Sequence, residues 1–223
     1  MSALLAAAQP LLATAAVVWG APVTWLEIVA FVLSVAMVVL NIRVDPLGWP
    51  LAIASSLLYL LLFWNSRLYG DASLQVFFAV VAAWGWWQWL RGTDAEGHVL
   101  RVRALDRHGR IGVGVAIAIA WPATALFLHR FTDTDVPWWD AFPTAASLVG
   151  QWLLGRKYVE NWPVWIGVDV VGAALFAYKG LWLTCLLYAV FVAMAAVGWR
   201  SWLRIADAAR AGSTAVAAAR GAA

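Results

Sequence analysis

The residues best suited to chemistry lie in the segment from Glu160 to Asp169, which reads Glu-Asn-Trp-Pro-Val-Trp-Ile-Gly-Val-Asp. Trp162, Trp165 and Asp169 are spaced i, i+3 and i+7, so on a helix they share one face. Two indole faces near a carboxylate suit a flat organic cation, because the rings attract the cation and the carboxylate supplies the counter-charge. The alternative is that Asp169 only locks a neighbouring helix by a hydrogen bond.

Further polar and aromatic residues extend this candidate site. Gln151 and Ser147 lie i, i+4 apart on the preceding apolar run, where amide and hydroxyl groups can bind ribose-type hydroxyls or join helices. The predicted substrate-binding residues are Trp162, Trp165, Asp169, Gln151, Asn161, Trp49, Gln75 and Tyr188.

The composition indicates that lipid surrounds this chain. Of its 223 residues 64% are hydrophobic and 12% are charged, and the mean hydropathy is +0.79. A soluble domain carries about 25% charged residues to keep its surface wet. The single Cys185, with no CxxC pair and no phosphate-binding loop, predicts no cofactor, no metal and no catalytic residues. The arginines lie between apolar runs, which argues against a nucleic-acid-binding face. We therefore expect a membrane protein that is not an enzyme.

Seven apolar runs are long enough to span a bilayer as helices. The stretch between Gly92 and Arg110 is polar and predicts a solvated loop, and the alanine-rich end predicts a fraying tail. Residues 2–18 are apolar but interrupted by Gln9-Pro10, and we expect a short membrane-associated helix there, a possible eighth segment by hydropathy. The predicted spans are Pro22–Ile42, Leu47–Trp64, Ala72–Leu90, Ile111–Leu128, Trp139–Leu154, Trp162–Tyr178 and Leu181–Leu203.

An internal repeat organises these runs. A shift of 113 residues without gaps gives 19 identities in 67 positions over residues 25–91, among them Arg43 with Arg156, Trp49-Pro50 with Trp162-Pro163, and Gly85-Trp86 with Gly198-Trp199. Ala52 and Ser56 stand where the second copy has Trp165 and Asp169, so the predicted site is asymmetric. Most other tryptophans, Trp89 and Trp202 among them, lie at the ends of runs, as in aromatic belts.

Each copy holds three spans, and one span separates them, so both copies have the same orientation in the membrane. We therefore predict seven transmembrane helices as two parallel three-helix repeats joined by a linker helix (3+1+3). The predicted parts are an N-terminal apolar segment (1–20), repeat 1 (21–91), a cytoplasmic loop (92–110), the linker helix (111–130), repeat 2 (136–204) and a cytoplasmic tail (205–223).

The basic residues predict the orientation. With seven spans, twelve Lys and Arg residues lie on one side and three (Arg67, Arg130 and Lys179) on the other. The positive-inside rule makes the first side cytoplasmic. This predicts an inner-membrane protein with its N-terminus outside and its C-terminus inside.

Residues 22–204 resemble the PnuC family of vitamin transporters. The resemblance rests on Ser147, Gln151, Arg156-Lys157, the Glu160 to Asp169 segment, Tyr178-Lys179-Gly180, Leu187-Tyr188 and the Gly-Trp-x-x-Trp ending of both repeats. It implies a larger relative of the SWEET fold, arranged three, one, three. It also implies uptake of nicotinamide riboside for NAD synthesis by facilitated diffusion, with an intracellular kinase that phosphorylates the substrate, and often a homotrimer.

Three alternatives stay open. Related branches of the family imply thiamine, which is also a flat cation, or riboflavin, which is uncharged and for which Asp169 argues less well. Ala52 and Gly172 are expected to leave space for the ligand. The rival from another class is a non-transporting membrane scaffold, in which Asp169 is a structural lock.

Overall fold

The computed structural model describes residues 9–18, 20–65, 69–94, 96–132, 136–178 and 182–221. The chain divides into two compact units, Met1–Leu90 and Arg91–Ala223. Each of the seven predicted runs is a helix, with ends that differ from the prediction mostly by a few residues. Arg67 and Lys179, which contribute to the predicted charge asymmetry, lie outside the described residues.

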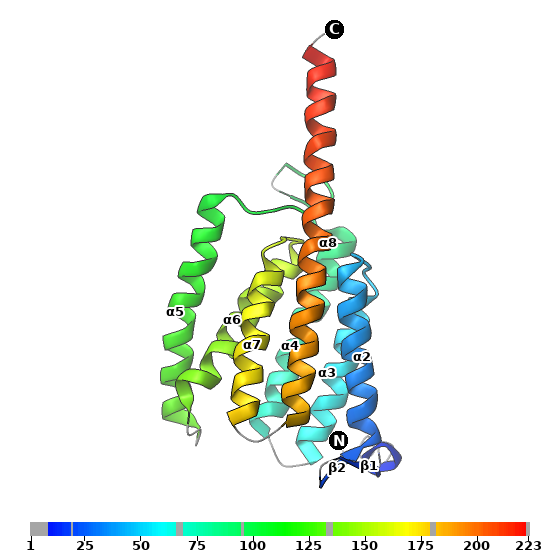
Figure 1. Ribbon diagram of the computed structural model, residues 1–223, viewed down its shortest axis with the longest axis vertical. Helices are drawn as coiled ribbons and strands as arrows, with labels where there is room; N and C mark the ends of the chain where they lie inside the picture. The colour runs from blue at the N-terminus through cyan, green and yellow to red at the C-terminus, as the bar shows by residue number, and fades with distance from the viewer. Residues whose placement is uncertain are drawn as a thin grey trace. The chain divides into compact units, whose positions relative to one another are not determined.

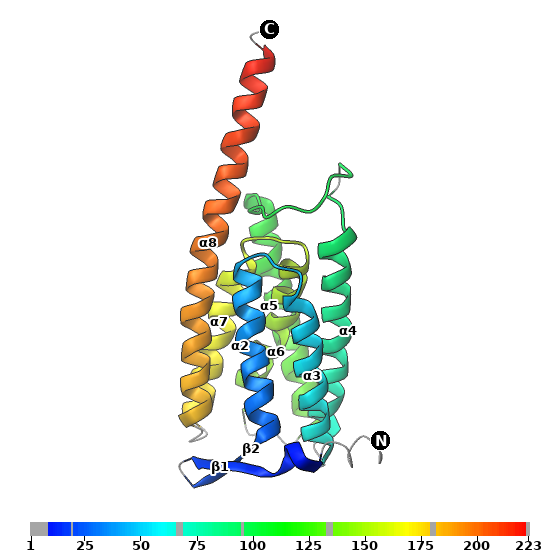
Figure 2. The same cartoon turned by 90° about the vertical axis from the view of Figure 1, so that its right-hand side faces the viewer.

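The first unit is a short hairpin followed by three helices (Figure 2). Strands β1 (Thr14–Val18) and β2 (Ala21–Thr24) pair antiparallel. They lead into α2 (Trp25–Ile42), α3 (Gly48–Asn65) and α4 (Tyr69–Arg91). Thr24 and Glu27 form a capping box at the start of α2, in which the Thr24 backbone N–H donates to Glu27 at 2.7 Å.

The N-terminal segment differs from the prediction. Of the expected helix over residues 2–18, residues 1–8 lie outside the described part, residues 9–12 are helical, and Thr14–Val18 form β1 instead. Pro10 interrupts helical hydrogen bonding, while the β-branched Val17 and Val18 favour a strand. Gly20 then adopts φ 84°, a conformation that glycine accepts readily and that turns the chain into β2.

The second unit holds α5 (Arg107–Phe131), α6 (Pro137–Gly155), α7 (Asn161–Tyr178) and α8 (Trp182–Gly221). Consecutive helices of this unit pack side by side, α5 on α6, α6 on α7 and α7 on α8 (Figure 1). Asp106 caps α5 by accepting from the Gly109 N–H at 2.7 Å. Pro137 stands in the first turn of α6, where its missing N–H has no helical partner to lose.

Two boundaries in this unit correct the sequence prediction. The loop predicted to reach Arg110 ends earlier, because the Asp106 cap starts α5 at Arg107. The tail predicted to fray continues α8 to Gly221 instead. Its many alanines explain this result, because alanine has the highest helix propensity.

The turn after α2 and the turn after α6 share one backbone geometry. Val44 and Lys157 are the non-glycine residues with positive φ in the described part of the chain, at 59° and 57°, and they stand 113 residues apart. The flanking hydrogen bonds also correspond, from Asp45 N to Leu40 O and from Tyr158 N to Leu153 O, each at 2.9 Å, and from Trp49 N to Pro46 O and Trp162 N to Val159 O, each at 3.2 Å.

Apolar side chains cover the outside of the helices. Val32, Ile119, Leu126 and Phe127 are each more than half exposed. Among the described residues, three stretches are long and apolar enough to cross a membrane: Trp25–Ile42, Arg107–Phe131 and Cys185–Gly212. Exposure of apolar surface on this scale fits lipid rather than water as the surrounding solvent. The chain is a helical, multi-pass membrane protein.

Candidate substrate site

Helix α7 carries the predicted cation-binding face. Trp162, Trp165 and Asp169 lie along one stripe of it, and Gly172 continues the stripe by one turn. All four contact or face other helices of the second unit, so the stripe is internal to the α6–α7–α8 layer rather than directed to lipid.

Trp162 is the most tightly packed of these residues. It is 3% exposed, its ring lies against Gly198 of α8, and it meets the Trp202 ring edge-on, with centroids 5.6 Å apart and planes at 87°. In the first unit Trp49 is packed in the same way, at 1% exposure, against Gly85 and edge-on to Trp89 at 5.5 Å and 84°. Both rings therefore fasten two helices together and offer little surface to a ligand.

This packing also corrects the aromatic-belt interpretation of Trp89 and Trp202. They are 4% and 0% exposed, so they belong to the interior of their units and not to a headgroup layer. Their partners are more than 35 residues away in the chain, which hid the contact from a pattern of local spacing.

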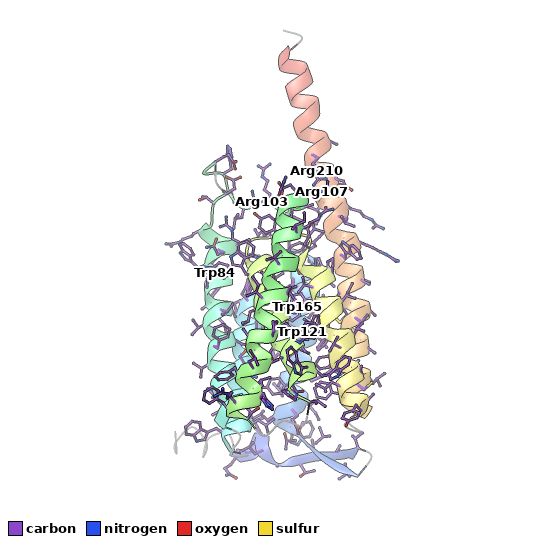
Figure 3. All side chains as sticks on the ribbon, turned by 90° about the vertical axis from the view of Figure 1, so that its left-hand side faces the viewer. Trp84, Arg103, Arg107, Trp121, Trp165 and Arg210 are labelled. Atoms are coloured by element: carbon purple, nitrogen blue, oxygen red, sulfur yellow. The ribbon has the colours of Figure 1, made fainter. Side chains whose placement is uncertain are left out.

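Trp165 and Gln151 lie where α7 passes α6. Helix α6 approaches closely because Gly150 has no side chain: a methyl group added there would lie 3.3 Å from Cε2 of Trp165. Trp165 is half-buried (Figure 3), and so is Gln151, the neighbour of Gly150. An aromatic face and an amide that both keep some accessible surface are therefore brought to one helix crossing.

Asp169 is the unusual group of this stripe. It is 7% exposed, and no hydrogen bond or ion pair to its carboxylate is found among the described residues. Withdrawing a carboxylate from solvent without a partner is costly. The structural-lock alternative requires a helix-to-helix hydrogen bond from Asp169, and the described part of the chain supplies none.

Tyr188 covers the end of the stripe. Its ring lies over Gly172, where an added methyl would come within 2.6 Å of it, and it packs on Phe176 with centroids 4.9 Å apart. The space that we expected beside Gly172 is thus filled by Tyr188 in this conformation. The result places Tyr188 one helical turn from Asp169, on the same side of α7.

The other predicted residues lie apart from the stripe. Asn161 is fully buried in the turn before α7, where its Nδ2 donates to the Tyr158 carbonyl at 2.6 Å and its Oδ1 has no partner in the described structure. Trp49 and Gln75 belong to the first unit, and Gln75 is half-buried on α4. Asn161 is therefore positioned to shape the turn rather than to line the stripe.

The sequence-based analysis missed a segment that holds this turn. Residues 99–105, which we call the strap, were predicted to be solvated, yet Leu100 and Val102 are 3% and 5% exposed. The strap runs along the α6–α7 turn: the Arg103 N–H donates to the Lys157 carbonyl at 3.1 Å, and the Val159 N–H donates to the Arg103 carbonyl at 3.0 Å. The alternation of apolar and basic residues from Val99 to Arg103 is the signal that predicts such a strand-like segment.

Side chains reinforce the strap. Arg103 donates to the Tyr158 hydroxyl at 3.0 Å with its guanidinium over the same ring. Glu160 accepts from the Leu105 N–H at 2.9 Å and from Arg110 at 3.0 Å. Lys157 is buried and donates to the Leu100 carbonyl, and burial lowers the pKa of Lys157 from its usual range. These contacts fix the point at which α7, and with it the stripe, begins.

Asp94, Glu96 and His98 form an acidic and imidazole cluster just before the strap, with ligand atoms within 4.8 Å of one another. Asp94 Oδ1 accepts from the backbone N–H groups of Glu96 and His98, at 3.1 and 2.8 Å. These bonds account for the gathering as a turn, and we assign it no metal.

Comparison with known proteins identifies the chain's relatives. The profile of the nicotinamide mononucleotide transporter family matches residues 24–204. The chain belongs to this family. The riboflavin/roseoflavin transporter RibM of Streptomyces davaonensis is 31% identical over 183 residues, covering 81% of this chain and 85% of RibM. The nicotinamide riboside transporter PnuC of Escherichia coli is 25% identical over 212 residues, covering 84% and 88% of the two chains.

The fold is shared as well. The crystal structure of the vitamin B3 transporter PnuC matches with a TM-score of 0.65 and 24% sequence identity, over 82% of each chain. The resemblance to the PnuC family is therefore confirmed. Family membership makes this chain a membrane transporter of the vitamin class and agrees with the prediction that it is not an enzyme.

Proposed function

We propose that this chain is a facilitated-diffusion uniporter that imports nicotinamide riboside for NAD synthesis. The observation that carries the proposal is Asp169, a carboxylate buried in the interior of unit 2 without a partner in the described part of the chain. A pyridinium cation supplies the missing counter-charge, whereas an uncharged ligand leaves it unmatched. The Escherichia coli relative is described as a nicotinamide riboside transporter.

The contacts at the helix crossing suggest the roles of the residues. Asp169 pairs with the pyridinium charge, the Trp165 face stacks on the ring, and the Gln151 amide bonds the ribose hydroxyls. Tyr188 closes the site one turn beyond Asp169. Asn161 and Trp162 hold the start of α7 and so act on the site through its position, while Trp49 and Gln75 remain contacts proposed from the sequence.

Riboflavin is the second candidate, because RibM has the higher identity of the two relatives compared above. Riboflavin has a large flat ring and ribityl hydroxyls, which also suit Trp165 and Gln151, but it has no positive charge for Asp169. Thiamine, a cation, is the alternative that Asp169 fits and that neither relative's description names.

The architecture that we propose is seven spans arranged as two parallel three-helix repeats around α5. Three correspondences at a spacing of 113 residues support it: the positive φ of Val44 and Lys157, and the two Trp-on-Gly contacts, Trp49 on Gly85 and Trp162 on Gly198. A shared backbone turn and a shared helix contact at one fixed offset are the structural counterpart of a sequence repeat.

We further propose an inner-membrane location with the N-terminus outside and the C-terminus in the cytoplasm. The support is the distribution of arginines, because the strap, the start of α5 and the end of α8 all carry them. A homotrimer, and a cytoplasmic kinase that traps the imported riboside, follow from the family resemblance alone.

Binding of the three vitamins to the purified protein tests the substrate. Tryptophan fluorescence is titrated with nicotinamide riboside, thiamine and riboflavin, for the wild type and for Asp169→Asn. We expect saturable quenching by nicotinamide riboside that Asp169→Asn weakens at least tenfold. Saturable binding of riboflavin alone, unchanged by Asp169→Asn, would transfer the proposal to the second candidate.

A pH gradient tests the passive mechanism. Uptake of nicotinamide riboside into proteoliposomes is compared with and without an imposed gradient. Facilitated diffusion predicts equal initial rates under both conditions. A severalfold acceleration by protons outside would show that Asp169 carries a proton with the substrate and would remove the uniporter assignment.

A further inference from the structure

A wedge-shaped groove separates α5 from α6 at the end of unit 2 where α5 begins. The two helices meet at the other end, where the Trp121 indole donates to the Trp138 carbonyl at 2.7 Å and packs edge-on against Phe142 at 5.5 Å. Figure 3 shows Trp121 far along α5 from Arg103 and Arg107. Towards these arginines the helices leave a cavity of about 550 Å³.

The walls of the groove are apolar and include glycine. On the α5 side they are formed by Gly109, Gly112, Val113 and Ala116, and on the α6 side by Leu148 and Trp152. Leu148 and Trp152 are 38% and 48% exposed, and a methyl group added at Gly112 would meet no atom within 4 Å. The groove therefore has room for an apolar chain from the surrounding bilayer.

Positive charge gathers at its mouth. The Trp152 wall stacks on Tyr158 with centroids 5.9 Å apart, and the Arg103 guanidinium lies 4.8 Å from the centre of the same Tyr158 ring. Arg110 stands on the first turn of α5, paired with Glu160. Arg107 is exposed, and within the described structure it has no acidic partner. The apolar groove thus ends in guanidinium groups, of which at least one is available to an anion.

We propose that this groove binds an anionic phospholipid, with one acyl chain between α5 and α6 and the phosphate at Arg107 and its neighbours. An apolar groove that opens among lipid-facing helices and closes on a basic end matches both parts of such a lipid. Basic pockets between helices on the cytoplasmic side of a membrane suit acidic headgroups for this reason. The occupant ties α5 to α6 at the end where the two helices make no contact through Trp121.

Paired glycines of α5 provide a matched test. Gly112 lines the groove and Gly114 does not, and an added methyl at either meets no atom within 4 Å. The delipidated protein is titrated in detergent with phosphatidylglycerol or phosphatidylcholine, and its melting temperature is followed. We expect phosphatidylglycerol to raise the wild-type melting temperature by several degrees more than phosphatidylcholine. Gly112→Leu should remove most of that shift, and Gly114→Leu should keep it.

A second pair tests the headgroup. Arg107→Gln should abolish the difference between the two lipids, whereas Arg200→Gln on α8 should preserve it. Native mass spectrometry of the same samples should show one fewer retained phosphatidylglycerol for Gly112→Leu, which keeps the test valid if that variant melts differently without lipid. Equal responses of the two glycine variants, or equal shifts from both lipids in the wild type, would overturn the proposal. So would a change of oligomeric state in Gly112→Leu with unchanged lipid binding, because the groove would then join copies of this chain.

Discussion

The indole ring of Trp162 lies directly against the backbone of Gly198, so α7 and α8 are held at a distance that tolerates no side chain at that glycine. Gly198→Ala should therefore destabilise the protein by about 1–3 kcal/mol, because the added methyl forces the ring or the helix to move. The measurement is the melting temperature in detergent. Gly114→Ala is the control, since nothing lies within 4 Å of its added methyl and alanine favours a helix. Equal melting temperatures for the two variants would contradict the contact.

The hydroxyl of Tyr158 accepts from Arg103 and helps to hold the strap on the α6–α7 turn. Tyr158→Phe removes this acceptor, and we expect a loss of about 1 kcal/mol with faster tryptic cleavage after Arg101 and Arg103. Digestion rates in detergent measure the effect. Tyr178→Phe should leave them unchanged, because Tyr178 is 71% exposed. An unaltered digestion rate in Tyr158→Phe would show that the hydroxyl does not secure the strap.

Lys157 makes stability depend on alkaline pH. Burial lowers its pKa in the folded protein below the 10.5 of the unfolded chain, so between the two values the unfolded state binds more protons. Stability should therefore rise with pH in this window, and the penalty for the buried charge should be fully present below it. Unfolding of the wild type and of Lys157→Met is compared from neutral pH to about the unfolded pKa of Lys. We expect a steeper rise for the wild type, and parallel profiles would refute the assignment.

Val44 occupies a left-handed conformation, at φ 59°, that a β-branched side chain accepts poorly. Val44→Asn should stabilise the first unit by about 0.5–1 kcal/mol, because asparagine tolerates this region and left-handed geometry costs other residues roughly 1–2 kcal/mol. Val44→Ile keeps the β-branch and serves as the control. If thermal unfolding shows no gain for asparagine over isoleucine, the turn is not strained at this residue.

The positions of the helices could be predicted from the sequence, because each run is apolar enough to show its limits without knowledge of its partners. The depth of Asp169 followed from its distance along α7. The strap could not be foreseen in the same way: Glu160 and Arg110 stand 50 residues apart, and only the folded chain brings their side chains together at 3.0 Å.

The tryptophans illustrate the other limit. Spacing alone assigned Trp162 to a ligand face and Trp202 to a headgroup layer, while the structure packs one ring edge-on against the other. A large aromatic at a helix end has the same sequence pattern in either case, and a glycine on the facing helix decides between them. The pairing of Trp49 with Gly85 and of Trp162 with Gly198, at one offset, is the pattern that could have revealed this packing.

The most direct measurement of the central claim is uptake of nicotinamide riboside and of riboflavin by proteoliposomes containing the wild type or Asp169→Asn. If Asp169 is the counter-charge of a cationic vitamin, the wild type imports nicotinamide riboside saturably, and Asp169→Asn lowers that uptake at least tenfold while its melting temperature stays within a few degrees. Wild-type uptake of riboflavin with none of nicotinamide riboside, or undiminished nicotinamide riboside uptake by a well-folded Asp169→Asn, would contradict the account.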